Sequence, residues 1–125
     1  MEDLYIRNIA KKGRAVFTNS PIKKGETIEF CPVLVIPYTE KKYIDNTRLY
    51  DYYFLWGDDQ RDIAIALGYG SLYNHEYTPN AMYECYFEEE VIVFKAIRDI
   101  EAHEEITISY NQDPDDKRRV WFEDE

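Results

Sequence analysis

The stretch NHEYTPN, residues 74–80, holds an imidazole and two carboxamides at fixed positions between two apolar runs. A surface loop needs only turn-forming residues, whereas these side chains can also donate and accept hydrogen bonds. Two interpretations follow. The stretch is either a well-capped turn or a loop whose backbone and amides, from Asn74 to Asn80, are arranged around a ligand.

Two other short segments carry polar groups beside apolar residues. The segment KGRAVF, residues 12–17, places a glycine and an arginine before an apolar run. The segment EEITISY, residues 104–110, alternates Ile106, Ile108 and Tyr110 with smaller polar residues, which is typical of a half-buried strand. Each segment alone is a weak signal, because a single tyrosine at a strand end is usually a core residue.

Taken together, in this order and spacing, segments 12–17, 67–80 and 104–110 resemble the SET-domain family of protein-lysine methyltransferases. The likeness covers roughly residues 5–111 and is strongest to the small stand-alone SET proteins of viruses and bacteria. The resemblance implies a mostly β fold, the SET-domain (β-clip) fold, of short curved sheets with a C-terminal pseudoknot. In that pseudoknot the C-terminal segment threads beneath a preceding loop.

The resemblance also implies a protein-lysine N-methyltransferase that transfers a methyl group from S-adenosylmethionine to a lysine amine of a basic protein. Such an in-line displacement depends chiefly on positioning, because the nitrogen must point at the methyl group. The amine must be neutral, although free lysine has a pKa of ~10.4. An aromatic channel beside a sulfonium cation lowers that pKa, since burial and a like charge both disfavour the ammonium.

By resemblance, Tyr110 is the catalytic tyrosine, whose hydroxyl orients the amine. The cofactor S-adenosylmethionine, which leaves as S-adenosylhomocysteine, is expected to bind at Lys12, Gly13, Arg14, Ala15, Asn74, His75, Tyr110 and Trp121. The channel for the substrate lysine is expected to be lined by Tyr52, Tyr69, Tyr83 and Ile108. His75 is expected to contribute its backbone and a structural hydrogen bond rather than ring chemistry, and no metal is expected.

Two positions depart from the family pattern. Ala15 replaces the second glycine of a G-x-G turn, and alanine resists a positive φ, so the backbone angle there is in question. Glu76 stands where a small residue usually follows Asn-His, and it either faces solvent or receives a basic substrate side chain. Both departures support one alternative, a catalytically weak or inactive SET scaffold that binds basic peptides.

The number of methyl groups transferred is a separate question. Tyr83 falls where some family members carry a tyrosine that limits this number, since its hydroxyl can hold a water or an amine. Ile108, at the other common restricting position, offers no hydroxyl. The resemblance favours mono- or dimethylation without deciding between them.

The elements that must position these residues are short and rich in β-branched and aromatic residues. Strands are predicted at 15–17, 27–30, 33–37, 63–67, 81–87, 91–97 and 105–110, with a hairpin tip at 88–90. Helix is scarce, amounting to a turn or two within 39–53 with Thr39 as its N-cap.

One local pattern recurs along the chain. Residues 22–28 and 100–106 share the pattern I-x-x-G/H-E-x-I. Both are expected to form a tight turn that feeds a strand, with Gly25 and His103 at the position that needs a positive φ. The pattern indicates a recurrent turn and not a repeat architecture.

The composition, taken alone, describes an acidic, tyrosine-rich β domain that binds basic ligands. The chain has 125 residues, of which 45% are apolar and 16% aromatic, and its net charge is −10. This charge disfavours direct nucleic-acid binding and favours Lys-rich partners such as histone or histone-like proteins. The two cysteines predict free thiols in a reducing compartment. Without a visible signal sequence or a membrane-length apolar run, the protein is expected in the cytoplasm or nucleus and not at a membrane.

The length predicts one domain. By resemblance, residues 1–125 form a single SET domain, and residues 111–125 are a short C-terminal tail in place of the zinc-bound post-SET module of larger relatives. Within that tail, Trp121 and Phe122 form either an aromatic lid over the cofactor or part of a frayed acidic end. The apolar residues 33–38 would permit a homodimer.

Overall fold

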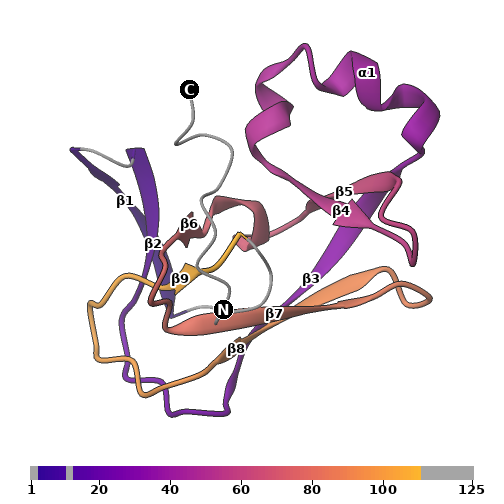
Figure 1. Cartoon of the computed structure of the whole chain (residues 1–125). Helices are drawn as coiled ribbons and strands as arrows, with labels where there is room; N and C mark the ends of the chain where they lie inside the picture. Colours follow the sequence, from indigo (N-terminus) through magenta and orange to yellow (C-terminus); the bar gives the residue numbers. More distant parts are fainter. Residues whose placement is uncertain (1–2, 11–12, 111–125) are drawn as a thin grey trace.

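The computed structural model describes residues 3–10 and 13–110, in which short strands predominate (Figure 1). In chain order the elements are β1 (Leu4–Ile9), β2 (Gly13–Thr18), β3 (Thr27–Ile36), η1 (Tyr38–Glu40), α1 (Lys41–Ile44), η2 (Arg48–Asp51), β4 (Tyr53–Trp56), β5 (Asp62–Ala66), η3 (Gly70–Leu72), β6 (Asn74–His75), β7 (Ala81–Tyr86), β8 (Val91–Ala96) and β9 (Thr107–Ile108). The strands form a pair β1-β2, a five-stranded sheet in the order β4-β5-β3-β8-β7, and a pair β6-β9. A mostly β architecture of several small sheets is therefore confirmed.

The ten-residue strand β3 joins the two halves of the central sheet. Its first half pairs with β8, with Cys31 opposite Ile92, and its second half pairs with β5, with Val33 opposite Ala66. Alternate residues of β3 turn inward, so Cys31 and Val33 are buried while Leu34 is 57% exposed. One strand thus carries both the β4–β5 hairpin and the β7–β8 hairpin.

The core lies where the three sheets meet. Val16 of β2, Phe94 of β8 and Ile106 before β9 are all fully buried and belong to one contiguous apolar cluster. Full burial of one such side chain is worth roughly 1.5–3 kcal/mol. The sheets are therefore held to one another chiefly through this shared core and not through a continuous ladder.

Most of the predicted strands are present, with differences at the ends of the chain and around the helical segment. The runs 27–30 and 33–37 form the single strand β3, and the run 105–110 contains only the two residues of β9. The strands β1, β4 and β6 are not predicted by the sequence. The middle of β1 is exposed and polar, which removes the alternation that would mark it as a strand.

The predicted helix over 39–53 is instead three short pieces, η1, α1 and η2, and together they form a helical insert that rises beside β4 and β5 (Figure 1). Thr39 as its N-cap is wrong, since Thr39 lies inside η1 and makes no cap there. The side-chain cap is made one piece later, where the Thr47 hydroxyl accepts the Leu49 N–H at 3.2 Å.

The two recurrent turns have the backbone conformation that their pattern predicts. Gly25 has φ 91° and His103 has φ 67°, so both positive angles are confirmed. The turns also lie side by side, because Ile22 and Ile100 exchange two backbone hydrogen bonds of 2.8 and 2.7 Å. The shared pattern therefore marks two turns that pair with each other.

Residues 105–108, near the end of the described chain, lie between two elements that are far apart in the sequence. On one side the Ile106 N–H donates to the Val16 carbonyl of β2 at 2.8 Å. On the other side β9 runs parallel to β6, with Thr107 opposite Asn74. Segments from the start, middle and end of the described chain are thereby brought together.

Asn80 fixes this insertion from the loop before β7. It is 1% exposed, its Oδ1 accepts the Thr107 N–H at 2.9 Å, and its Nδ2 donates to the Glu105 carbonyl at 2.7 Å. The Asn80 N–H also lies 3.3 Å from the Thr107 hydroxyl. A single carboxamide therefore satisfies two backbone groups that the short strand β9 leaves unpaired.

Replacement Asn80→Ala is expected to lower the free energy of unfolding by about 2–4 kcal/mol, because two buried backbone groups lose their partners. Urea unfolding followed by circular dichroism measures this change. Asn46→Ala is the matched control, since the Asn46 amide donates to the Lys42 carbonyl at the surface, and its effect should stay below ~1 kcal/mol. Equal effects of the two variants would contradict the role given to Asn80.

Candidate active site

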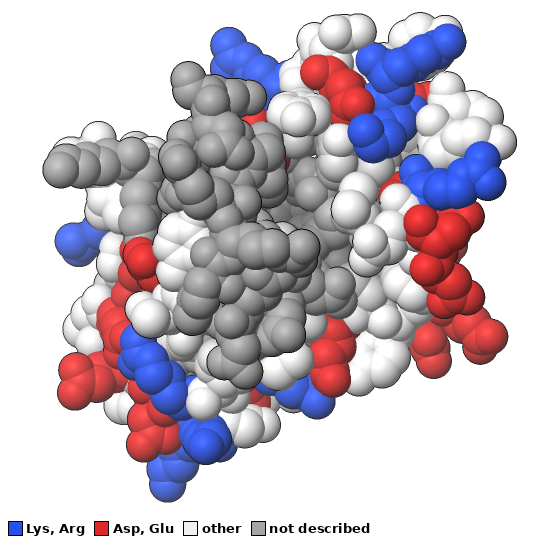
Figure 2. Space-filling view, in the orientation of Figure 1, with Lys and Arg blue, Asp and Glu red and all other residues white. Residues whose placement is uncertain are grey.

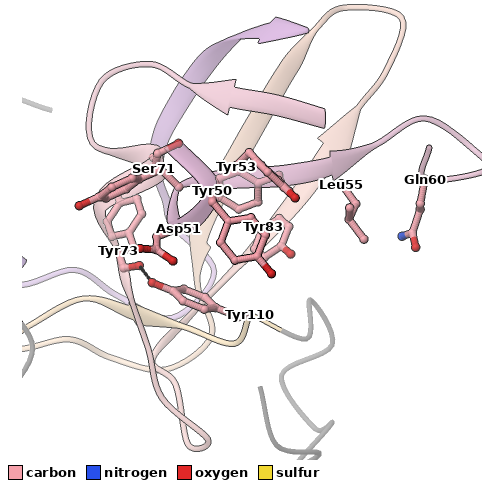
Figure 3. Close-up of a pocket in the computed structure, with 12 residues that line it drawn as sticks. Tyr50, Asp51, Tyr53, Leu55, Gln60, Ser71, Tyr73, Tyr83 and Tyr110 are labelled. Atoms are coloured by element: carbon pink, nitrogen blue, oxygen red, sulfur yellow. Dashed lines mark hydrogen bonds between the residues drawn. The ribbon is translucent and has the colours of Figure 1, made fainter. Parts of the chain in front are cut away.

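A cavity of about 440 Å³ opens between the helical insert, β4 and the segment that leads into β6 (Figure 3). Six tyrosines and one carboxylate contribute to its walls. The described residues that line it are Tyr50, Asp51, Tyr52, Tyr53, Phe54, Leu55, Gln60, Gly70, Ser71, Tyr73, Tyr83 and Tyr110. Such walls combine an apolar body with polar tips, which suits a long aliphatic side chain that ends in a polar group.

The helical insert fixes one wall of this pocket. The Tyr53 hydroxyl donates to the Asp45 carboxylate at 2.7 Å, and the Lys41 ammonium donates to the other oxygen at 2.9 Å. The bond from Tyr53, together with the bond and charge of Lys41, holds the pKa of Asp45 below its usual range. The carboxylate stays ionised and keeps the Tyr53 ring in place.

Tyr83 of β7 forms the facing wall. Its ring packs edge-on against Phe54 at 5.0 Å and tilted against Phe94 at 6.0 Å, and the residue is 8% exposed. Burial raises the pKa of Tyr83, so its hydroxyl is neutral. Within the described part of the chain this hydroxyl makes no hydrogen bond, and Figure 3 shows it on the side of the pocket where Tyr110 lies. It is therefore available to a water or to a ligand.

Tyr110 lines the end of the pocket that lies next to the β6–β9 pair, called the inner end below. Its hydroxyl donates to the Tyr73 carbonyl at 2.8 Å, the bond drawn in Figure 3, and its N–H donates to the His75 Nδ1 at 3.0 Å. Burial raises the pKa of Tyr110 to about 12, and the nearby charges of Tyr52, Asp51 and Glu105 add to the effect. The hydroxyl is consequently neutral at physiological pH, and the His75 ring holds the backbone of Tyr110.

Asn74 connects the three sequence segments that carry the family resemblance. Its Nδ2 donates to the Arg14 carbonyl at 3.0 Å and to the Glu105 carboxylate at 2.9 Å. The start of β2, the strand β6 and the segment before β9 therefore meet at one side chain. Tyr110 is two residues beyond the β6–β9 pair, so the same convergence lies next to the inner end of the pocket.

The groups around Asn74 fit the expected cofactor. S-adenosylmethionine carries an ammonium and a sulfonium, and the Arg14 carbonyl and the Glu105 carboxylate are acceptors that favour such cations. The backbone at Gly13 has φ 77°, and among the described residues no atom lies within 4 Å of where a side chain would project, so these residues leave room for close approach. Ala15 lies in β2 without a positive φ and is fully buried, so the missing second glycine causes no backbone strain.

The predicted channel residues divide into two groups. Tyr52 and Tyr83 line the pocket, whereas Tyr69 and Ile108 do not. The Tyr69 side chain turns toward β1, where its hydroxyl donates to the Leu4 carbonyl at 3.3 Å. Ile108 is 1% exposed and belongs to the core cluster, because the side of β9 on which it lies faces inward. Tyr69 and Ile108 therefore lie outside the lining of this pocket, and their role in the channel stays a prediction.

Of the remaining predicted residues, Lys12 and Trp121 lie outside the described residues, as does the predicted aromatic lid of the tail. Glu76 is half-buried, and its N–H donates to the Ile108 carbonyl at 2.9 Å, which extends the β6–β9 pairing by one bond. The sequence did not single out Tyr73, Tyr50 or Tyr53. The run YDYYF at 50–54 is the one signal that could have found part of this wall, because aromatic residues are concentrated there.

Two further properties bear on function. Among residues 3–10 and 13–110, no three His, Cys, Asp or Glu side chains lie where they could hold one metal ion together. No helix in the same part of the chain is long and apolar enough to span a bilayer.

Comparison with known proteins identifies the family. The sequence pattern of the SET domain matches residues 13–111. The chain is 34% identical over 123 residues to a histone-lysine N-methyltransferase of Schizosaccharomyces pombe described as specific for H3 lysine 37. The match covers 98% of this chain and 78% of the yeast protein.

Solved structures agree with the family match. A candidate histone methyltransferase of Plasmodium falciparum superposes with a TM-score of 0.71 at 32% identity, covering 96% of each chain. A Chaetomium thermophilum Polycomb Repressive Complex 2 protein superposes with a TM-score of 0.70 at 22% identity, over 86% of this chain and 14% of its own; at that identity the likeness concerns the fold alone. The chain thus belongs to the SET-domain family and is a protein-lysine methyltransferase that takes its methyl group from S-adenosylmethionine.

Proposed function

We propose that this enzyme methylates a lysine in a histone tail, that Tyr110 is its catalytic residue, and that the tyrosine-lined pocket receives the lysine. The observation that carries the proposal is the Tyr110 hydroxyl, which lies at the inner end of that pocket and donates its proton to the Tyr73 carbonyl at 2.8 Å. Gly13, Arg14, Asn74 and His75 hold the cofactor beside it. S-adenosylmethionine supplies an electrophilic methyl group on its sulfonium sulfur.

Tyr110 acts by orienting the amine. Its own proton is donated to the Tyr73 carbonyl, so toward the substrate the Tyr110 oxygen acts as an acceptor of an amine N–H. An amine held in this way directs its nitrogen lone pair along a fixed line, which is the main requirement of an in-line displacement. Since the pKa of Tyr110 is raised to about 12, the hydroxyl remains neutral and does not remove the amine's proton as a phenolate.

The pocket also selects the side chain that enters. Asp51 lies in the pocket lining, and its carboxylate attracts a protonated lysine, whereas burial between the tyrosine rings disfavours a fully desolvated ammonium. The lysine is expected to lose its proton to water before methyl transfer. A long aliphatic stem between aromatic rings leaves only the terminal nitrogen to be recognised by polar groups.

The proposed substrate class rests on charge and on one relative. The chain carries a net charge of −10, and acidic side chains gather along the right-hand edge of the face in Figure 2, while the lower-left edge carries both acidic and basic side chains. Basic, Lys-rich polypeptides are the partners that such a surface favours. The Schizosaccharomyces pombe relative is described as acting on histone H3, so the H3 tail is the first substrate to test and the nucleus the expected place of action. Pairing of two copies through residues 33–38 stays a prediction.

The alternative of an inactive scaffold loses its main support. It rested on Ala15 and Glu76, and Ala15 occupies ordinary strand backbone. The intact Asn74 contacts and the placement of Tyr110 at the pocket both favour turnover. Cofactor binding without methyl transfer to any histone would restore this alternative.

Tyr110→Phe is expected to lower kcat on histone H3 by at least ~10²-fold, because the amine loses the group that orients it. Mass spectrometry of histones after incubation with S-adenosylmethionine gives the rate and the modified lysine. The control is Tyr86→Phe, whose hydroxyl bonds Glu84 at the surface and should leave the rate unchanged. Calorimetry with S-adenosylhomocysteine checks that the Tyr110 variant is folded and still binds. Full turnover by Tyr110→Phe would refute its catalytic role.

Tyr83→Phe is expected to shift the product toward higher methylation states. Removing the hydroxyl frees the space of a water or of one methyl group next to Tyr110, which a bulkier methylated amine can then use. The ratio of mono-, di- and trimethylated peptide, measured at equal extents of conversion, reports this change, with Tyr86→Phe again as control. An unaltered ratio would show that Tyr83 does not limit product size.

The rate is expected to rise with pH up to about 10 without a falling limb. The substrate amine becomes reactive as it loses its proton, with a pKa of ~10.4 when free. Tyr110 has its pKa raised to about 12, so it keeps its proton, and its role, throughout that range. A profile of kcat/KM against pH, with circular dichroism at each point, tests this. A decline centred near pH 10 would mean that Tyr110 ionises in the ordinary range.

A further inference from the structure

Glu29 of β3 is a buried carboxylate that the site described above does not use. It is 2% exposed, and no ion pair of the described residues includes it. Its partners are two hydrogen-bond donors: the Tyr73 hydroxyl at 2.6 Å and the Tyr69 N–H at 3.0 Å. Burial, together with the charge of Glu29, raises the pKa of the neighbouring Cys31 thiol. The carboxylate is thus held without a compensating cation.

A buried carboxylate of this kind is unfavourable for stability unless its hydrogen bonds offset the loss of water. Short charge-assisted bonds such as the one from Tyr73 are about twice as strong as neutral ones and strongly directional. The chain also approaches Glu29 closely: a side-chain carbon added at Gly68 would lie 2.5 Å from its Oε2. The segment that leads into β6 is therefore wrapped tightly over this carboxylate, which indicates a geometric role.

The segment held by Glu29 is the one that orients the catalytic tyrosine. Tyr73 is 1% exposed, with its hydroxyl on Glu29 and its ring packed against Phe94 at 4.7 Å. The carbonyl of the same residue accepts the Tyr110 hydroxyl at 2.8 Å, the bond drawn in Figure 3. Two hydrogen bonds, both made by Tyr73, therefore connect the Glu29 carboxylate to the Tyr110 hydroxyl at the inner end of the pocket.

We propose that Glu29 is a positioning residue for methyl transfer: it fixes the Tyr73 side chain and, through it, the carbonyl that orients the Tyr110 hydroxyl. The inference rests on the proposed role of Tyr110. Without the bond to Glu29, the buried Tyr73 hydroxyl must find another partner, and the ring and its carbonyl shift with it. A displacement of ~1 Å at a reacting group lowers a rate by up to ~10²-fold, so a partial shift is expected to lower kcat roughly 5–20-fold.

Tyr73→Phe is the direct test, since it removes one hydroxyl and leaves the carbonyl in the chain. We expect kcat to fall roughly 5–20-fold while KM for S-adenosylmethionine stays within about twofold, because the cofactor groups at Asn74 and Arg14 remain. Thr18→Val is the matched control. Thr18 is fully buried, and its hydroxyl makes two local hydrogen bonds with Ser20, so the variant loses comparable bonds elsewhere in the core. It should lower Tm similarly and leave kcat unchanged.

Two variants of Glu29 separate geometry from simple loss of stability. Glu29→Gln keeps an oxygen that accepts the Tyr69 N–H and gains an N–H that can donate to the Tyr73 hydroxyl. It should therefore retain kcat within about threefold of wild type. Glu29→Ala removes both acceptors and should lower kcat at least as far as Tyr73→Phe does. Equal kcat values for the two Glu29 variants, whatever their Tm, would overturn the proposal.

A double variant tests the connection to Tyr110. When Tyr110→Phe has already removed the hydroxyl, adding Tyr73→Phe should change the residual single-turnover rate by less than twofold, since nothing is left to orient. If adding Tyr73→Phe lowers the rate of the Tyr110→Phe variant as much as it lowers the rate of wild type, Tyr73 acts only through stability, and the proposal is overturned. The failures are distinguishable: wild-type turnover by Tyr110→Phe overturns the proposed function, whereas impaired Tyr110→Phe with unimpaired Tyr73→Phe overturns only the role of Glu29.

Discussion

The strands β6 and β9 pair in parallel over two residues each, and the whole active site depends on this contact. The pairing brings Asn74 next to Thr107 and His75 next to Ile108. Because Tyr110 follows two residues later, its N–H reaches the His75 ring and its hydroxyl reaches the pocket. A two-residue ladder has little stability of its own, so the insertion is held from outside by Asn80 and by the core around Ile106.

The tyrosines of the pocket differ in what their hydroxyls do, and this difference gives the pocket its polarity. Tyr53 and Tyr73 donate to carboxylates, those of Asp45 and Glu29, so their rings act as fixed walls. The Tyr110 hydroxyl donates to a backbone carbonyl, so toward a substrate amine its oxygen acts as an acceptor. Only Tyr83, among the six, is both nearly buried and without a hydrogen bond to a described residue, so the space beside it is where a water or a methyl group fits.

The sequence was sufficient for the family, most of the strands and the positive φ angles of Gly25 and His103, because each depends on local residue types or on a combination of short motifs. It was insufficient where packing between distant segments determines the direction and the partner of a side chain. Tyr69 was expected in the channel. In the structure it follows Gly68, which has a positive φ, and its hydroxyl donates to the Leu4 carbonyl of β1. The role of Tyr73 could not be read from its neighbours, since its partner Glu29 lies on β3, far away in the sequence.

Glu29 shows that a residue with a positioning role can look unfavourable when the sequence alone is considered. In the strand TIEFCPVLVI a glutamate at an inward-facing position breaks the apolar pattern, and an apolar residue there would be expected to give a more stable core. The carboxylate is tolerated because two donors from the segment 69–73 satisfy it. Those donors belong to the segment that supplies the carbonyl for Tyr110. A loose apolar contact would allow that segment several positions, whereas two directional bonds allow one. The geometry of the inner end of the pocket thus depends on a buried carboxylate of the central strand β3.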